Sequence, residues 1–97
     1  MVLNSLISGG CIISGGKVLS SILSPRVHIH SHAEVWNSIL MDEVDVGRYA
    51  CLNRVIVDKG VRIPEGCQIG FRLEEDAEKF TVSESGIVVI PKGTLLG

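Results

Sequence analysis

Apolar residues recur along the first seventy positions at an almost constant interval. The repeating units begin at Ser5, Ser21, Ser38 and Val55, which lie 16, 17 and 17 residues apart. The positions that follow fall into apolar columns: Leu6, Ile22, Ile39 and Ile56; Ile7, Leu23, Leu40 and Val57; Cys11, Val27, Val44 and Val61; Ile13, Ile29, Val46 and Ile63; Lys17, Ala33, Ala50 and Cys67; Leu19, Val35, Leu52 and Ile69. A fixed period of this kind indicates a solenoid, in which each coil buries its inner face on its neighbours.

The spacing inside each unit predicts short β-strands. In the third unit the inward candidates are Val46, Ala50 and Leu52, at steps of four and two residues. A helix would place apolar residues every three or four positions, and the Gly, Pro, Ser and β-branched content disfavours one. Strands with period two, turning a corner after about five or six residues, fit this six-residue rhythm better. Each unit is therefore predicted to form three strands around a triangular core.

The rhythm stops after Gly70, and the remaining residues predict a cap on the last coil. Residues 73–80, LEEDAEKF, have a helix-forming composition, with acidic residues first and Lys79 near the end, as the helix dipole favours. Ala77 and Phe80 are expected on the packed face of this helix. Residues 86–90, GIVVI, are typical of a buried strand. We therefore predict one all-β domain over residues 1–97, a parallel β-helix of about four coils (1–70) with a capping helix and strand (71–97).

The first coil is expected to need a cover. A free-standing solenoid carries a polar cap at each end, and the N-terminal residues provide none. We expect that another segment or another chain covers this coil. Lys17 in an inward column agrees with a terminal coil, where its ammonium group can reach water.

Composition narrows the functional classes. A hydrophobic fraction of 45% with only 4% aromatic residues suits a narrow aliphatic core. The net charge of −2 gives no reason to expect binding to nucleic acid or to an anionic membrane. No apolar run approaches the roughly 18 residues of a membrane span, and the N-terminus lacks the charged region of a signal peptide. These features predict a cytoplasmic protein.

The residues that could perform chemistry have simpler explanations. Cys11, Cys51 and Cys67 form no CxxC pair and are odd in number, which favours small buried side chains over a disulfide or a metal site. Alternation places His28 and His30 on the outer face. Exposed polar strand positions are the favoured interpretation of this pair, with a shared metal or a catalytic base as alternatives. We expect no catalytic residue and no metal ligand in this chain.

One column predicts an interface. If Ile7, Leu23, Leu40 and Val57 face inward, their neighbours must face out. The outward ladder consists of Leu6, Ile22, Ile39 and Ile56. Coils about 4.8 Å apart would make it a continuous apolar stripe, which monomers rarely leave exposed. We expect the stripe to pack against another domain or subunit.

Several phrases resemble one enzyme family over nearly the whole chain. They are SLISGGCIISGG (5–16), SILSPRVHI (21–29), VIVDKGVRIPEG (55–66), and EEDAEKF followed by SGIVVIPKG (74–93). In this order they resemble the C-terminal domain of bacterial glucose-1-phosphate adenylyltransferase (ADP-glucose pyrophosphorylase). The resemblance implies a left-handed parallel β-helix of hexapeptide repeats. It also implies a homotetramer in which this domain supports a separate N-terminal catalytic domain.

The resemblance implies a role without catalysis. In the family, the N-terminal domain uses Mg²⁺ to make ADP-glucose and pyrophosphate from ATP and glucose 1-phosphate for glycogen synthesis. This chain has neither the Gly-rich phosphate loop of that domain nor paired acids suited to Mg²⁺, so alone it is expected to be inactive and to hold no cofactor. Lys59 and Lys92 match basic residues of the family's allosteric site for phosphorylated effectors. Both are lysines where the enterobacterial pattern has arginine. A lysine keeps the positive charge but cannot make the two parallel hydrogen bonds of a guanidinium group to phosphate.

Two other functions stay open from the sequence. A hexapeptide-repeat acyltransferase would work as a trimer with a histidine between subunits. The β-helix of another sugar-phosphate nucleotidylyltransferase, such as a guanylyltransferase, would differ mainly in the catalytic domain. The C-terminal cap and its IPKG sequence (90–93) favour the adenylyltransferase over the acyltransferase.

Overall fold

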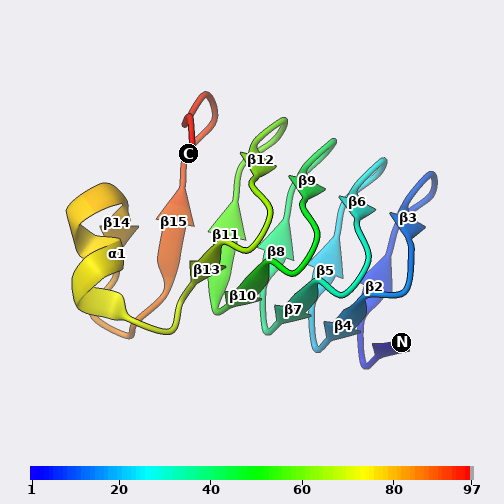
Figure 1. Cartoon of the computed structure of the whole chain (residues 1–97), viewed down its shortest axis with the longest axis horizontal. Helices are drawn as coiled ribbons and strands as arrows, with labels where there is room; N and C mark the ends of the chain where they lie inside the picture. Colours follow the sequence, from blue (N-terminus) through cyan, green and yellow to red (C-terminus); the bar gives the residue numbers. More distant parts are fainter. Residues whose placement is uncertain (97) are drawn as a thin grey trace.

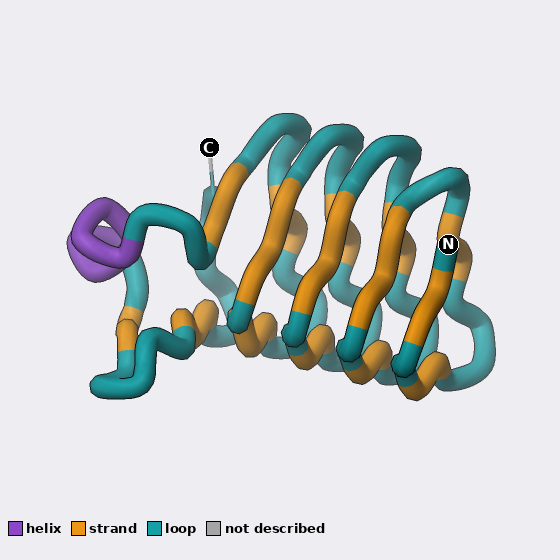
Figure 2. Tube along the Cα trace, turned by 90° about the horizontal axis from the view of Figure 1, so that it is seen from below, coloured by secondary structure: helices purple, strands orange, loops and turns teal. Residues whose placement is uncertain are grey.

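The computed structural model, which describes residues 1–96, is a triangular prism of stacked coils (Figure 1). Its principal extents are 32 × 24 × 20 Å. The chain winds through three sheets, and each coil adds one strand to each sheet. The N-terminus lies at one end of the stack and the α-helix at the other (Figure 2). The predicted solenoid of about four coils is confirmed.

The three sheets have short strands in regular order. The first sheet runs β1 (Val2–Leu3), β4 (Lys17–Leu19), β7 (Glu34–Trp36), β10 (Cys51–Asn53) and β13 (Gln68–Ile69), all parallel. The second runs β2 (Leu6–Ile7), β5 (Ile22–Leu23), β8 (Ile39–Leu40), β11 (Val55–Val57), β15 (Val88–Ile90) and β14 (Thr81–Val82). The third runs β3 (Ile12–Ile13), β6 (His28–Ile29), β9 (Asp45–Val46) and β12 (Arg62–Ile63).

The apolar columns stack along the prism axis as the repeat predicts. Val27, Val44 and Val61 are 0%, 0% and 2% exposed. Backbone bonds join their coils, because the N–H of His28 donates to the carbonyl of Val44 and that of Asp45 to the carbonyl of Val61. Since the inward side chains are aliphatic, the interior is filled by packing and buries no charged side chain of these columns.

Serine hydroxyls link one corner of the coils. The hydroxyl of Ser21 accepts the backbone N–H of Ser38 at 3.0 Å, and the hydroxyl of Ser38 accepts that of Val55 at 3.2 Å. Ser5 does the same for Ser21. Each hydroxyl also donates to a carbonyl two residues earlier. The serines that begin the repeating units therefore satisfy backbone donors that the strands leave unpaired.

The predicted columns are wrong by one residue in the first coil after Ile13. Lys17 pairs with Glu34 and is exposed, whereas Val18 pairs with Val35 in the core. The corner of this coil is one residue shorter than the later corners, and Gly16 occupies the inward position predicted for Lys17. A Cβ atom on Gly16 would lie 2.9 Å from the carbonyl oxygen of Ala33, so only glycine fits. The side chain of Lys17 therefore points outward into water, and the prediction that it belongs to an inward column is wrong.

The predicted helix and strand at the C-terminal end are confirmed, but the helix packs with a different face than predicted. Helix α1 (Leu73–Lys79) lies at the end of the stack, and β15 pairs in parallel with β11 as a further rung. The inward residue of α1 is Asp76, which is 6% exposed, whereas Ala77 is exposed and does not share the predicted packed face with Phe80. Gly97 lies outside the described residues.

Helix α1 has only seven residues, and a bilayer requires about 20. Within residues 1–96, no helix has the length and apolarity to cross a membrane.

Candidate functional site

Lys59 and Lys92 lie at the same corner on adjacent rungs. Each follows the aligned pair Val57 and Ile90 by two residues. The carboxylate of Asp58 joins the two corners, because Oδ1 accepts the backbone N–H of Lys59 at 2.7 Å and Oδ2 accepts that of Lys92 at 3.3 Å. Both lysines are exposed, and neither forms an ion pair within residues 1–96. The structure thus brings together the two predicted anion-binding residues.

A shallow hollow continues from the lysine corner. Its wall includes Gly60 and Gly93, the residues directly after the two lysines, and also Arg62. Arg62 is the charged residue in the lining of this hollow, whereas Lys59 and Lys92 precede two of its lining residues and do not line it themselves. Asp58 contributes one opposing charge, which its two backbone hydrogen bonds partly offset. The arrangement suits a phosphorylated small molecule held at the surface.

The predicted apolar ladder faces outward, and the structure extends it. Strand register places Leu6 beside Ile22, Ile22 beside Ile39, and Ile39 beside Ile56. The added member is Val89 of β15, which pairs with Ile56. Leu6 is 70% exposed and Ile39 is 36% exposed. Five rungs at about 4.8 Å make a stripe roughly 19 Å long, in which Ile56 and Val89 are only partly exposed.

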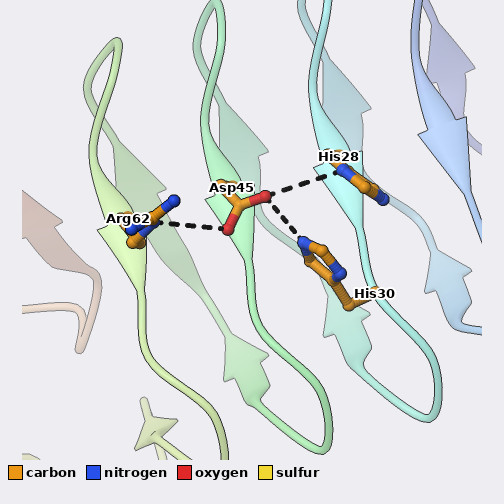
Figure 3. Close-up of polar contacts among 4 residues, drawn as sticks. All are labelled: His28, His30, Asp45 and Arg62. Carbon is orange, nitrogen blue, oxygen red and sulfur yellow. Dashed lines mark hydrogen bonds and ion pairs between the residues drawn. The ribbon is translucent and has the colours of Figure 1, made fainter.

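His28 and His30 meet a carboxylate from the next coil. Their rings stack with centroids 3.8 Å apart. Nε2 of His30 lies 2.8 Å from Oδ1 of Asp45, and Nδ1 of His28 lies 3.7 Å from the same oxygen (Figure 3). Nε of Arg62, one coil further, lies 3.7 Å from Oδ2. The outward direction of both histidines is confirmed, and the cluster is accessible because its side chains are between 30% and 36% exposed, apart from the more exposed Arg62.

His32 does not join this cluster. It lies at a corner with φ of 61°, and its ring stacks on Tyr49 with centroids 4.9 Å apart. The two rings belong to adjacent coils and cover the corner from outside.

The three cysteines are free and partly buried. Burial raises the pKa of Cys67, an effect that Lys79 opposes and Asp76 reinforces. Burial also raises the pKa of Cys51, with a further contribution from the Glu34 carboxylate. These two thiols are therefore weak nucleophiles at neutral pH.

Two residues of the histidine cluster were not identified from the sequence. Asp45 and Arg62 complete the histidine cluster, and their positions could have been found, because each lies 17 residues after the preceding member of the row that starts at His28. The inward direction of Asp76 had no such signal, since it lies after the repeats end.

Comparison with known proteins places the solenoid and the larger part of its cap in one family. A family profile described as "GlmU-like, C-terminal hexapeptide" matches residues 1–90. A protein of Anaeromyxobacter sp. is 54% identical over 89 residues, which are 92% of this chain and 22% of the relative. A protein of Deinococcus radiodurans is 52% identical over 91 residues (93% and 22%), and one of Albidiferax ferrireducens is 50% identical over 90 residues (93% and 21%). All three relatives are named glucose-1-phosphate adenylyltransferase, and this chain spans about a fifth of their length.

Proposed function

This chain belongs to the GlmU-like C-terminal hexapeptide family, and we propose that it is the regulatory and assembly domain of a glucose-1-phosphate adenylyltransferase. The enzyme of which it is part would convert ATP and glucose 1-phosphate into ADP-glucose and pyrophosphate in the cytoplasm, for glycogen synthesis. ATP and Mg²⁺ would bind a catalytic domain outside this chain. The observation that carries the proposal is the identity of 50% to 54% with enzymes of that name over 92% to 93% of this chain.

The scaffold role is supported by the aliphatic core inside the prism and the apolar ladder on its outside. Its inward positions in residues 1–96 form one aliphatic core, so these side chains serve packing. The apolar ladder from Leu6 to Val89 gives the outside a surface for the catalytic domain or a second subunit. Assembly into the homotetramer of the family would cover this stripe.

The regulatory role is supported by the lysine corner. Lys59 and Lys92 come from segments 33 residues apart and are held side by side through Asp58. A phosphorylated effector bound there would contact the last coil and the cap together. Binding could then change how the cap and its neighbours meet the catalytic domain.

A domain exchange tests the proposal. The aligned C-terminal segment of the Anaeromyxobacter relative would be replaced by residues 1–97 of this chain, and ADP-glucose formation would be measured with ATP, glucose 1-phosphate and Mg²⁺. We expect activity comparable to that of the unmodified relative. The relative truncated before this segment is the matched control. A folded exchange protein that is no more active than the truncated control would contradict the proposal, as would ADP-glucose synthesis by the 97-residue chain alone.

A further inference from the structure

We propose that His28, His30 and Asp45 form a binding site for a divalent transition-metal ion such as Zn²⁺. The site lies on the outer face of the third sheet, where His28 belongs to β6, His30 directly follows β6, and Asp45 belongs to β9. Its three ligands take no part in the proposed adenylyltransferase role, which uses the second sheet and the lysine corner, although Arg62 lies next to both the site and the hollow beside that corner. From the sequence, the two histidines are expected to be ordinary polar positions, since Asp45 lies 15 residues beyond His30.

The backbone sets the three side chains toward one point. His28 and His30 are two residues apart and therefore project from the same face of the strand. Asp45 is the register partner of His28 on the adjacent coil. Figure 3 shows both imidazoles directed at one carboxylate oxygen. Two of the candidate ligands thus lie on paired strands, and His30 directly follows β6, where its backbone N–H still donates to the carbonyl of Val46 in β9.

The distances suit a single ion. One nitrogen from each histidine and one oxygen of Asp45 all lie within 4.8 Å of one another. An ion bound at roughly 2.0–2.2 Å from each atom can join atoms up to about 4.4 Å apart. Small rotations of partly exposed side chains close the difference. The ion would replace the hydrogen bond between His30 and Asp45, which is 2.8 Å long.

The ligand chemistry selects the type of metal. Two imidazole nitrogens and one carboxylate favour Zn²⁺, Co²⁺ or Ni²⁺, whereas Mg²⁺ and Ca²⁺ prefer sites made of oxygen. Three protein ligands leave a fourth position open to water or to a group from another molecule. Both imidazoles must be neutral to bind, so acid should release the ion.

Arg62 opposes binding in a way that can be measured. Its guanidinium group lies 3.7 Å from Oδ2 of Asp45, where it competes with an ion for the carboxylate. The side chain is 84% exposed and can swing into water. Replacing it should therefore strengthen metal binding, which is the opposite effect from removing a ligand.

Calorimetric titration of the 97-residue chain with Zn²⁺ tests the site. We expect one ion per chain, and a loss of affinity of about tenfold or more in each of His28→Gln, His30→Gln and Asp45→Asn. His32→Gln is the matched control, since His32 lies on the same coil outside the cluster, and it should bind as the wild type does. Arg62→Gln should bind Zn²⁺ more tightly than the wild type. Excess Mg²⁺ should not displace Zn²⁺.

Two further readouts separate the site from folding and from thiol binding. Zn²⁺ should raise the Tm of the wild type and of His32→Gln, but not that of His28→Gln or His30→Gln. The Co²⁺-loaded chain should show visible bands without a thiolate charge-transfer band, because the cysteines are not ligands. The proposal is overturned by a lack of saturable Zn²⁺ binding, by equal affinity in the histidine variants and the wild type, or by a thiolate band.

Discussion

Asp76 of the capping helix accepts a hydrogen bond from the backbone N–H of Gly70, with Oδ2 2.8 Å from the nitrogen. Gly70 is the last residue of the solenoid and has φ of +95°, and a Cβ atom there would lie 1.8 Å from the carbonyl oxygen of Asn53. The chain must therefore turn at a glycine, and the carboxylate satisfies the donor that this turn leaves free. Asp76 is the one buried residue of α1, so this bond fastens the cap to the last coil.

Replacing Asp76 should loosen the cap. Asp76→Ala leaves the Gly70 N–H without its partner, and we expect a loss of about 1–3 kcal/mol in the free energy of unfolding measured with urea. Glu78→Ala, on the exposed side of the same helix, is the control and should change stability little. Equal stability in the two variants would show that the bond does not hold the cap.

The serine corner gives a second prediction about stability. Ser38 is 2% exposed, and its hydroxyl is the partner of the Val55 N–H. Ser38→Ala should cost about 1–3 kcal/mol, because a buried donor is left unpaired. Ser14→Ala, at an exposed position, is the comparison variant. Thermal or urea unfolding that fails to distinguish the two variants would contradict the role of the serines.

Stability should fall in alkali because of Cys67. Burial raises the pKa of this thiol in the folded state, so the neutral thiol adds to the free energy of unfolding. This contribution is fully present below the ordinary thiol pKa and is lost as the pH rises through the pKa of the folded state. Cys67→Ala is the matched control, since Ala33 and Ala50 occupy the same column. Urea midpoints at neutral and alkaline pH should show a smaller alkaline loss in this variant. An alkaline loss as large as that of the wild type would refute the assignment.

The lysine corner should bind phosphorylated anions through its charge. During titration with fructose 1,6-bisphosphate, the backbone amide signals of Lys59 and Lys92 should shift together, because Asp58 accepts both N–H groups. Lys59→Gln and Lys92→Gln should each weaken binding by about 1 kcal/mol, roughly fivefold in Kd.

Two further variants sharpen the test of this corner. Lys59→Arg should tighten binding, because the guanidinium restores bidentate contact with phosphate. Lys17→Gln, at the opposite end of the solenoid, should have no effect. If Lys17→Gln weakens binding as much as Lys59→Gln does, binding is general charge attraction and not a site.

The solenoid was predictable because its constraint is periodic. A residue that must stack on its equivalents one coil away repeats its character every 16 or 17 positions, as Val27, Val44 and Val61 do. The error at Lys17 has a physical cause. Gly16 occupies the inward column in a corner that is one residue shorter, and because glycine has no side chain, the apolar pattern of the sequence does not reveal it.

The candidate sites were predictable only in part. The outward ladder follows from alternation, so Ile39 could be placed from the sequence. The pairing of Lys59 with Lys92 rested on resemblance, since β15 lies beyond the repeats. The meeting of His28 with Asp45 follows from the 17-residue register but concerns polar positions, which the apolar pattern does not constrain.

The most direct test of the scaffold role is the molar mass of the domain-exchange protein, measured by light scattering. Ile39→Lys places a charge in the middle of the apolar ladder, whereas Ile12→Lys places one on a different sheet at a residue that is 54% exposed. We predict that the parent and Ile12→Lys assemble beyond one chain, and that Ile39→Lys dissociates to a smaller species while its Tm stays close to that of the parent. An unchanged mass for Ile39→Lys would contradict the account.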